Sequence, residues 1–225
     1  MTFKLVVFDI DGTLIPFRKV ISNKVSKTIK ILENQGVRIA FSSGKNISYL
    51  EKIAQNIGIN KPIIVAENGC VIFDIAENKE VWLTERTSPI NKIREKILDK
   101  YSELVEEQLN TVEFTFSVTR LQPEAVFYIK SLINEYSERV HVYEYAGCFD
   151  ILPMGIDKGV GLARVKRIYG FKKEDVVAIG DGENDIPMFR EAGLALIIGS
   201  QISYPNAINF NTAEEVLDFL TKYMK

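Results

Sequence analysis

Short apolar runs rich in β-branched residues alternate with amphipathic stretches along most of the chain. Apolar runs with few polar interruptions are typical of strands that are covered on both faces, as in a parallel sheet. We therefore expect five strands of this kind, at residues 3–8, 37–41, 62–65, 176–179 and 194–198.

Helices are expected between these strands. Ser22 and Asn46 favour helix N-termini, and Gly36 and Gly58 are suited to end the same two helices. The spacing of apolar residues predicts three more helices, at residues 158–169, 184–192 and 212–223. This alternation predicts a doubly wound α/β fold, a Rossmann-like core around a parallel sheet.

The middle of the chain has a different pattern. Its expected elements are helices at 90–101 and 123–136 and strands at 112–118, 140–145 and 149–152. Two of these strands alternate apolar and polar residues, which is typical of an antiparallel sheet with helices on one face. We expect an α+β cap domain at residues 85–153, inserted into a discontinuous core formed by residues 1–84 and 154–225.

The composition limits the number of domains and the classes of partner but does not indicate a function. The 225 residues are enough for one large domain or a core with a smaller companion, and 46% of them are hydrophobic. A formal net charge of -2 gives no indication of a nucleic-acid or membrane-surface partner. No apolar run is long enough to span a bilayer, so we expect a cytoplasmic protein. Cys70 and Cys148 match no metal-ligand spacing and are expected to be buried thiols.

Two carboxylates end the first predicted strand. Asp9 and Asp11 lie at positions i and i+2, so in extended backbone they project to the same side. Open α/β sheets bind their ligands at this carboxyl edge. Because two like charges at such a place repel each other, the pair predicts a hard cation such as Mg²⁺, which takes oxygen ligands.

A second acidic turn follows the strand at 176–179. The segment GDGENDIPMF places Asp181 in a glycine-flanked turn and Asp185 four residues later. Gly180 and Gly182 allow the backbone to come close to a ligand. Two acidic turns at one edge of a sheet indicate a metal site.

Two further segments complete a phosphate site. FSSGK ends the strand at 37–41, so the Ser43 hydroxyl and the Gly44 amide are candidates to hold phosphate oxygens at a helix N-terminus. GIDKG places Lys158 at the start of a predicted helix, where its charge would neutralise phosphate.

Three competing motifs are incomplete. A calcium-binding loop starting at Asp9 needs Gly and Glu where Leu14 and Val20 stand. A P-loop around SGK needs Gly and a hydroxyl residue where Ile39 and Asn46 stand. A dinucleotide fingerprint would need a third glycine at position 185. A dinucleotide-binding oxidoreductase stays the alternative from another class, and a Mg²⁺ requirement without bound nicotinamide would separate the two.

DIDGT, SSG, the lysine of GIDKG and GDGEND, in this order, resemble the motifs of the haloacid dehalogenase superfamily of aspartate-nucleophile phosphatases. The resemblance covers essentially the whole chain. The insert lies between the second and third motifs, as in the Cof-type branch with an α/β cap. In detail the chain is similar to the archaeal phosphoglycolate phosphatases, which are of comparable size.

The resemblance implies roles for the motif residues. Asp9 matches the nucleophile that forms an aspartyl-phosphate, and Asp11 matches the general acid and base. Asp9, the Asp11 backbone carbonyl and Asp181 match the Mg²⁺ ligands, with Asp185 either a ligand or a partner of one.

Ser43 and Lys158 match the groups that hold the phosphoryl, and Asn184 matches an assisting group. Lys45 departs from the arginine or asparagine that relatives often carry after the glycine.

The resemblance also implies the reaction. We expect a Mg²⁺-dependent hydrolysis of a small phosphorylated metabolite, with phosphoglycolate as the first candidate and a broad sugar-phosphate phosphatase as the alternative. Arg86, Arg120 and Lys130 are cations of the insert that could meet a substrate carboxylate, although such side chains are more often solvated. Monomer and homodimer both stay open.

Overall fold

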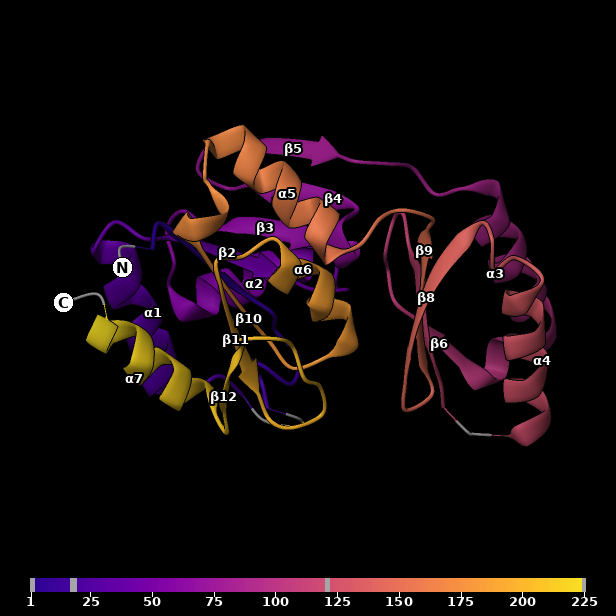
Figure 1. Cartoon of the computed structure of the whole chain (residues 1–225). Helices are drawn as coiled ribbons and strands as arrows, with labels where there is room; N and C mark the ends of the chain where they lie inside the picture. The colour runs from indigo at the N-terminus through magenta and orange to yellow at the C-terminus, as the bar shows by residue number, and fades with distance from the viewer. Residues whose placement is uncertain (1–2, 17–19, 120–121, 224–225) are drawn as a thin grey trace.

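A mixed sheet of eight strands forms the centre of the larger of two lobes (Figure 1). The computed structural model describes residues 3–16, 20–119 and 122–223. The strands follow the order β12-β11-β10-β1-β2-β3-β4-β5, in which β12 to β3 are parallel and β4 and β5 form an antiparallel extension. Their bounds are β1 (Leu5–Phe8), β2 (Arg38–Ser42), β3 (Ile63–Ala66), β4 (Val71–Asp74), β5 (Lys79–Trp82), β10 (Val176–Gly180), β11 (Leu194–Ile198) and β12 (Ile208–Phe210).

Helices cover both faces of this sheet, which confirms the doubly wound α/β prediction. Apolar residues of α1 (Asn23–Asn34), α2 (Ile47–Ile57) and α7 (Ala213–Tyr223) pack in one buried cluster. The other face is packed by α5 (Lys158–Tyr169) and α6 (Ile186–Arg190). Strand β1 supplies alternate residues to the two clusters, because successive side chains of a strand point to opposite faces.

The predicted helix ends are confirmed where a capping side chain was identified. The Ser22 hydroxyl accepts from the backbone N–H of Val25, and the Asn46 carboxamide accepts from that of Tyr49. Gly58 follows α2 with φ of 82°, the left-handed conformation that glycine adopts at little cost.

A second, antiparallel sheet has the order β6-β7-β9-β8. Its strands are β6 (Val105–Glu107), β7 (Phe114–Val118), β8 (Val140–Tyr145) and β9 (Cys148–Pro153), and its helices are α3 (Ser88–Tyr101) and α4 (Pro123–Asn134). Figure 1 shows both helices on the outer face, so that the sheet lies between them and the core. We call this sheet and its two helices the cap. The cap boundaries at residues 85 and 153 stay a prediction.

Several details differ from the sequence analysis. The helix predicted at 184–192 is present but shorter: a 3₁₀ turn, Glu183–Asp185, precedes a helix of only five residues, α6. The Asp185 carboxylate accepts from the backbone N–H groups of Asp181 and Gly182, which holds the chain in the tighter turn. Cys148 is exposed rather than buried, because it lies beside the β8–β9 hairpin turn. The sequence analysis does not predict the β4–β5 hairpin or the short strands β6 and β12.

No helix in the described part of the chain is long and apolar enough to cross a membrane. The cytoplasmic location stays a prediction.

A turn of unusual backbone follows β3. Glu67, Asn68 and Gly69 all have positive φ, at 51°, 49° and 101°. Asn tolerates this region, but Glu adopts it rarely. A side chain at Gly69 has no room, since its Cβ would lie 2.1 Å from the carbonyl oxygen of Asp157. The turn is therefore packed tightly against the segment that begins α5.

We predict that Gly69→Ala destabilises the protein more than Gly36→Ala. Gly36 has a similar φ of 89°, but a Cβ there would meet nothing within 4 Å. In the control, the free energy of unfolding should fall by about 1–2 kcal/mol, because alanine disfavours the left-handed backbone conformation. The clash at Gly69 should add about 1–3 kcal/mol. Denaturant unfolding measures both variants, and equal losses would contradict the close packing of this turn.

Candidate active site

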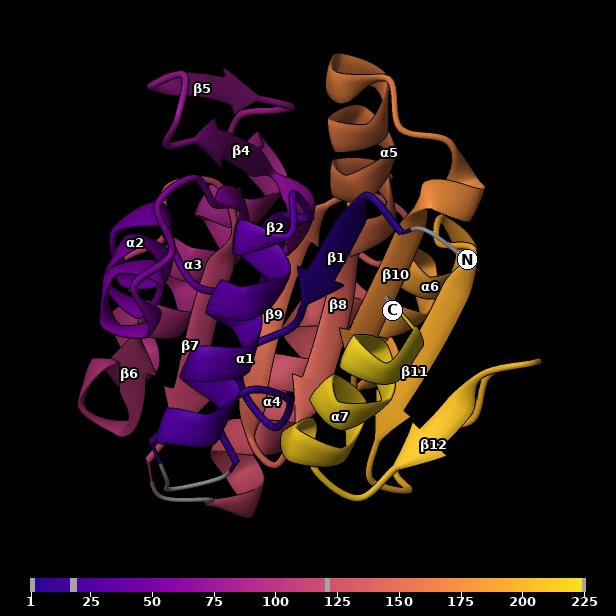
Figure 2. The same cartoon turned by 90° about the vertical axis from the view of Figure 1, so that its left-hand side faces the viewer.

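The four predicted motifs meet at the carboxyl edge of the large sheet. Asp9 follows β1, Ser43 follows β2 and Asp181 follows β10. Figure 2 shows β1 between β2 and β10, as the strand pairing requires. The parallel arrangement therefore brings together side chains that are far apart in sequence.

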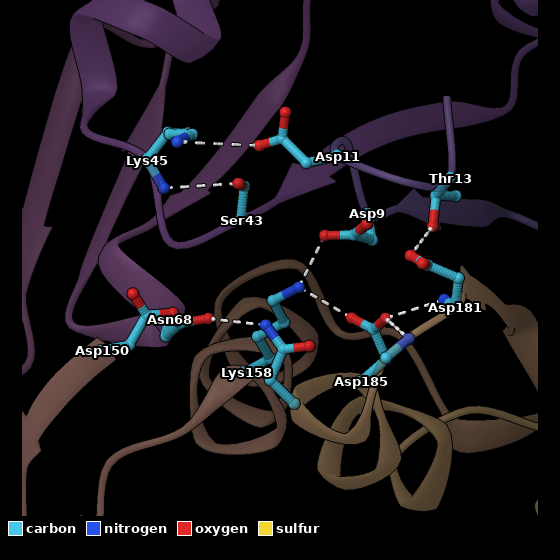
Figure 3. A network of polar contacts seen from close by, with 12 residues as sticks. Asp9, Asp11, Thr13, Ser43, Lys45, Asn68, Asp150, Lys158, Asp181 and Asp185 are labelled. Carbon is cyan, nitrogen blue, oxygen red and sulfur yellow. Dashed lines mark hydrogen bonds and ion pairs between the residues drawn. The ribbon is translucent and has the colours of Figure 1, made fainter. Parts of the chain in front are cut away.

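Lys158 lies at the centre of the site (Figure 3). Its Nζ is 2.7 Å from Asp9 Oδ1 and 2.7 Å from Asp185 Oδ1, and its side chain is 0% exposed. Burial lowers the pKa of Lys158, but Asp185 and Asp9 raise it by more, so the pKa lies above its ordinary value. The lysine is thus held as a buried cation between two carboxylates.

Asp185 uses both of its oxygens. Oδ1 faces Lys158, and Oδ2 accepts from the backbone N–H groups of Asp181 at 2.9 Å and Gly182 at 3.0 Å. A side chain at Gly180 is excluded, because its Cβ would lie 2.3 Å from Asp185 Oδ2. Burial raises the pKa of Asp185 to about 6, against the opposing effect of Lys158. Asp185 therefore fixes the shape of the turn that carries Asp181.

The donor set fits a hard divalent cation. Asp9, Asp181 and Asp185 each offer a carboxylate oxygen, and these oxygens all lie within 4.8 Å of one another. Thr13 orients this group, since its hydroxyl donates to Asp181 Oδ1 at 2.8 Å. Burial raises the pKa of Asp9 and of Asp181, and a neighbouring carboxylate adds to each shift, Asp181 for Asp9 and Asp185 for Asp181. Lys158 balances only one of the three, and Mg²⁺ prefers such oxygen ligands.

Asp11 lies outside this cluster. Its side chain is 52% exposed and its Oδ2 is 4.0 Å from Lys45 Nζ. Figure 3 shows the two side chains facing each other above the Asp9–Lys158 pair. The position next to Gly12 brings Asp11 close to the nucleophile candidate while its carboxyl stays accessible to a substrate. This is a suitable place for a group that exchanges protons with a leaving group.

The loop after β2 is bonded to the cap. Ser43 is buried, and its Oγ accepts from the backbone N–H of Lys45 at 3.3 Å. The Gly44 carbonyl accepts from the side chain of Asn110 at 2.9 Å, and Lys45 Nζ donates to Gln108 Oε1 at 3.1 Å. The cap is thus docked on the loop that the sequence assigns to phosphate.

The sequence analysis missed a buried polar cluster beside this loop. Asn68 Nδ2 donates to Glu113 Oε2 at 3.0 Å and to Asp150 Oδ2 at 3.1 Å. Asn68 Oδ1 accepts from Asn184 Nδ2 at 3.2 Å. Burial raises the pKa of Glu113 well above its ordinary value, with Asp150 adding to the shift. The one signal in the sequence was a lone Glu between the apolar residues Val112 and Phe114.

Two of the three candidate cap cations, Arg86 and Lys130, are engaged elsewhere. The Arg86 guanidinium donates to three backbone carbonyls, those of Asn110, Val112 and Glu113. Lys130 pairs with Glu144 at 2.7 Å. Arg120 lies outside the described residues. Among the described residues, Lys45 on the core side forms the ion pair with Asp11.

Comparison with known proteins places this site in a family. A family model described as haloacid dehalogenase-like hydrolase matches residues 6–103 and 84–208. The chain is 27% identical over 207 residues to a phosphoglycolate phosphatase of Methanopyrus kandleri, covering 85% of this chain and 82% of that protein. It is 28% identical over 210 residues to the 5-amino-6-(5-phospho-D-ribitylamino)uracil phosphatase YcsE of Bacillus subtilis, covering 88% of this chain and 84% of that protein.

The fold has a close counterpart among solved structures. A haloacid dehalogenase-like hydrolase from Bacteroides thetaiotaomicron superposes with a TM-score of 0.82 at 18% identity, covering 97% of this chain and 100% of that chain. The similarity extends over core and cap together.

We predict that Lys158→Met lowers the free energy of unfolding by about 3–5 kcal/mol at neutral pH, because two buried carboxylates lose their cation. Without the lysine the pKa of both carboxyls rises further in the folded state. The folded protein then binds more protons than the unfolded chain, so the loss should shrink as the pH falls toward about 4. Denaturant unfolding in chelator at several pH values measures this.

Lys130→Met, which breaks an exposed pair, is the matched control and should cost less than about 1 kcal/mol. A Lys158→Met variant as stable as this control would contradict the central position of the lysine.

Proposed function

We propose a Mg²⁺-dependent mechanism through an aspartyl-phosphate for this chain, which belongs to the haloacid dehalogenase-like hydrolase family and is a phosphatase. The observation that carries the proposal is the buried Lys158, 2.7 Å from Asp9, with the acidic turn of Asp181 and Asp185 on the same side. A cation and a cluster of carboxylates around one nucleophile candidate suit phosphoryl transfer, which needs positioning and charge neutralisation.

In the first step an Asp9 oxygen bonds to phosphorus as the bond from phosphorus to the leaving oxygen breaks. Asp11 gives a proton to that oxygen, so that an alcohol departs. In the second step Asp11 takes a proton from a water molecule whose oxygen bonds to phosphorus. The acyl phosphate bond then breaks, and Asp9 and inorganic phosphate are released.

Other groups hold the phosphoryl and its charge. The Ser43 hydroxyl, the Gly44 amide, Lys158 and Asn184 are the candidates to contact its oxygens. Asp9, the Asp11 backbone carbonyl and Asp181 would hold Mg²⁺, with Asp185 as a ligand or as the support of the turn. The ion supplies positive charge that neutralises the transferring phosphoryl.

Phosphoglycolate is the first candidate substrate. Several relatives bear that name, among them the Methanopyrus kandleri protein. Lys45 Nζ, 4.0 Å from Asp11, would lie near the leaving oxygen that Asp11 protonates. Glycolate carries its carboxylate on the carbon next to that oxygen, which places a negative charge within reach of Lys45.

One observation favours a second candidate, a hydroxylated phosphoester such as a sugar phosphate. Asp150 of the cap lies beside the loop after β2, since a Cβ built on Gly44 would be 3.2 Å from Asp150 Oδ2. A carboxylate accepts hydrogen bonds from hydroxyls and repels a substrate carboxylate. The YcsE relative is named for a ribityl phosphate.

We predict that Asp9→Asn abolishes phosphate release from any phosphomonoester while the protein stays folded, because an amide cannot form the acyl phosphate. Asp11→Asn should slow turnover by roughly a hundredfold or more. Chelation should remove the activity and Mg²⁺ should restore it. Steady-state assays with thermal unfolding as the folding control test this, and near-normal turnover of Asp9→Asn would refute the mechanism.

We predict a higher kcat/KM for phosphoglycolate than for hexose or pentose phosphates. Lys45→Met should lower kcat/KM for phosphoglycolate at least tenfold, about 1.4 kcal/mol, and leave an aryl phosphate nearly unaffected. Asp150→Asn serves as the counterpart, since it should lower kcat/KM for sugar phosphates and not for phosphoglycolate. A sugar phosphate that is preferred tenfold over phosphoglycolate would make the second candidate the substrate class and leave the chemistry intact.

A further inference from the structure

The turn at Glu67, Asn68 and Gly69 contacts the loop after β2, the cap and the acidic turn at Asn184. The backbone of the turn is hydrogen-bonded to the loop after β2. Glu67 N–H donates to the Lys45 carbonyl at 3.0 Å, and Asn68 N–H donates to the Ser43 carbonyl at 2.9 Å. All three residues are buried. The turn is therefore part of the same unit as the loop after β2.

The Glu67 side chain binds the cap at residues 108–113, the loop between β6 and β7, which we call the cap loop. Its carboxylate accepts from the backbone N–H groups of Thr111 at 2.9 Å and of Val112 at 2.7 Å. These charge-assisted bonds offset the cost of holding a glutamate at positive φ. The docked cap loop thus stabilises the strained backbone of this turn.

Asn68 connects this contact to the acidic turn. Its Nδ2 carries two hydrogens, and these reach one carboxylate on the cap loop, Glu113, and one on β9, Asp150. Its Oδ1 accepts from Asn184, the residue before Asp185. One fully buried carboxamide therefore joins two cap segments to the turn that carries Asp181.

We infer that Asn68 is a positioning residue that couples docking of the cap to the placement of Asn184 over the phosphoryl site. This inference rests on the proposed function. When the cap leaves, Asn68 Nδ2 loses both of its acceptors. When the cap docks, the carboxamide is fixed at both ends, and Asn184 is held in one orientation. The conformational freedom of this one carboxamide is lost once for both contacts, so docked cap and ordered Asn184 stabilise each other.

Asn68→Gly tests the inference without disturbing the backbone, because glycine accepts positive φ readily. It should lower kcat/KM for p-nitrophenyl phosphate about tenfold or more, as expected on losing hydrogen bonds to buried carboxylates. It should also speed amide exchange at Thr111, Val112 and Glu113. Asn78→Gly is the matched control, since Asn78 also has positive φ, 46°, but is exposed. It should leave both quantities unchanged.

An exchange of donor and acceptor gives a second test. Asn68→Asp places a carboxylate against Glu113 and Asp150 and should impair kcat/KM at least as much as Asn68→Gly. Adding Glu113→Gln restores a donor, since the new amide can donate to the carboxylate introduced at position 68 while its oxygen still accepts from Asn110 and Thr115. The double variant should recover at least threefold of kcat/KM, roughly 0.6 kcal/mol.

The outcomes are separable. Three results would each overturn the positioning role. They are a kcat/KM of Asn68→Gly within twofold of the unmodified protein, unchanged amide exchange in that variant, and a kcat/KM of the double variant no higher than that of Asn68→Asp. Absence of Mg²⁺-dependent hydrolysis in the unmodified protein would refute the proposed function instead. The amide-exchange comparison needs no turnover and still decides whether Asn68 holds the cap.

Discussion

The contact on which the site depends is the buried lysine between two carboxylates. Lys158 reaches Asp9 and Asp185 at the same distance, 2.7 Å, and none of its side chain is exposed. Desolvating a lone carboxylate is expensive, and Lys158 opposes the rise that burial causes in the pKa of Asp9. Its position is set by the start of α5, where Asp157 caps the helix by accepting from Val160 N–H at 2.8 Å. A helix start thus places the charge around which the other groups arrange.

The parallel sheet and its glycines make this arrangement possible. Neighbouring strands bring Asp9, Ser43 and Asp181 to one edge, and the backbone must then pass very close to the carboxylates. A Cβ on Gly12 would lie 2.2 Å from Asp181 Oδ2, and one on Gly180 2.3 Å from Asp185 Oδ2. Only glycine fits at such approaches. The site is therefore compact because its turns carry no side chains at these two points.

The cap adds a second polar layer that depends on the first. Glu113 is buried and Asp150 is half-buried, and both accept from Asn68, which the core supplies from a strained turn. A small displacement of the cap would break these hydrogen bonds without admitting water to replace them. The bonds therefore make the docked position of the cap specific.

The sequence by itself determined five of the six strands of the parallel core, all but β12, and the capped helices. It also gave the candidate residues Asp9, Asp11, Ser43, Lys158, Asp181 and Asp185, because apolar periodicity and turn motifs are local patterns. Only the tertiary structure decided the rest. In the folded chain Arg86 donates to backbone carbonyls, and the Asp11 side chain lies apart from the carboxylate cluster. Asn68 and Asn184 form a hydrogen bond. The Asn68–Asn184 contact joins residues 116 positions apart, and each is an ordinary turn residue in sequence. A buried hydrogen bond depends on the orientation of two side chains from different elements, and no local pattern encodes that orientation.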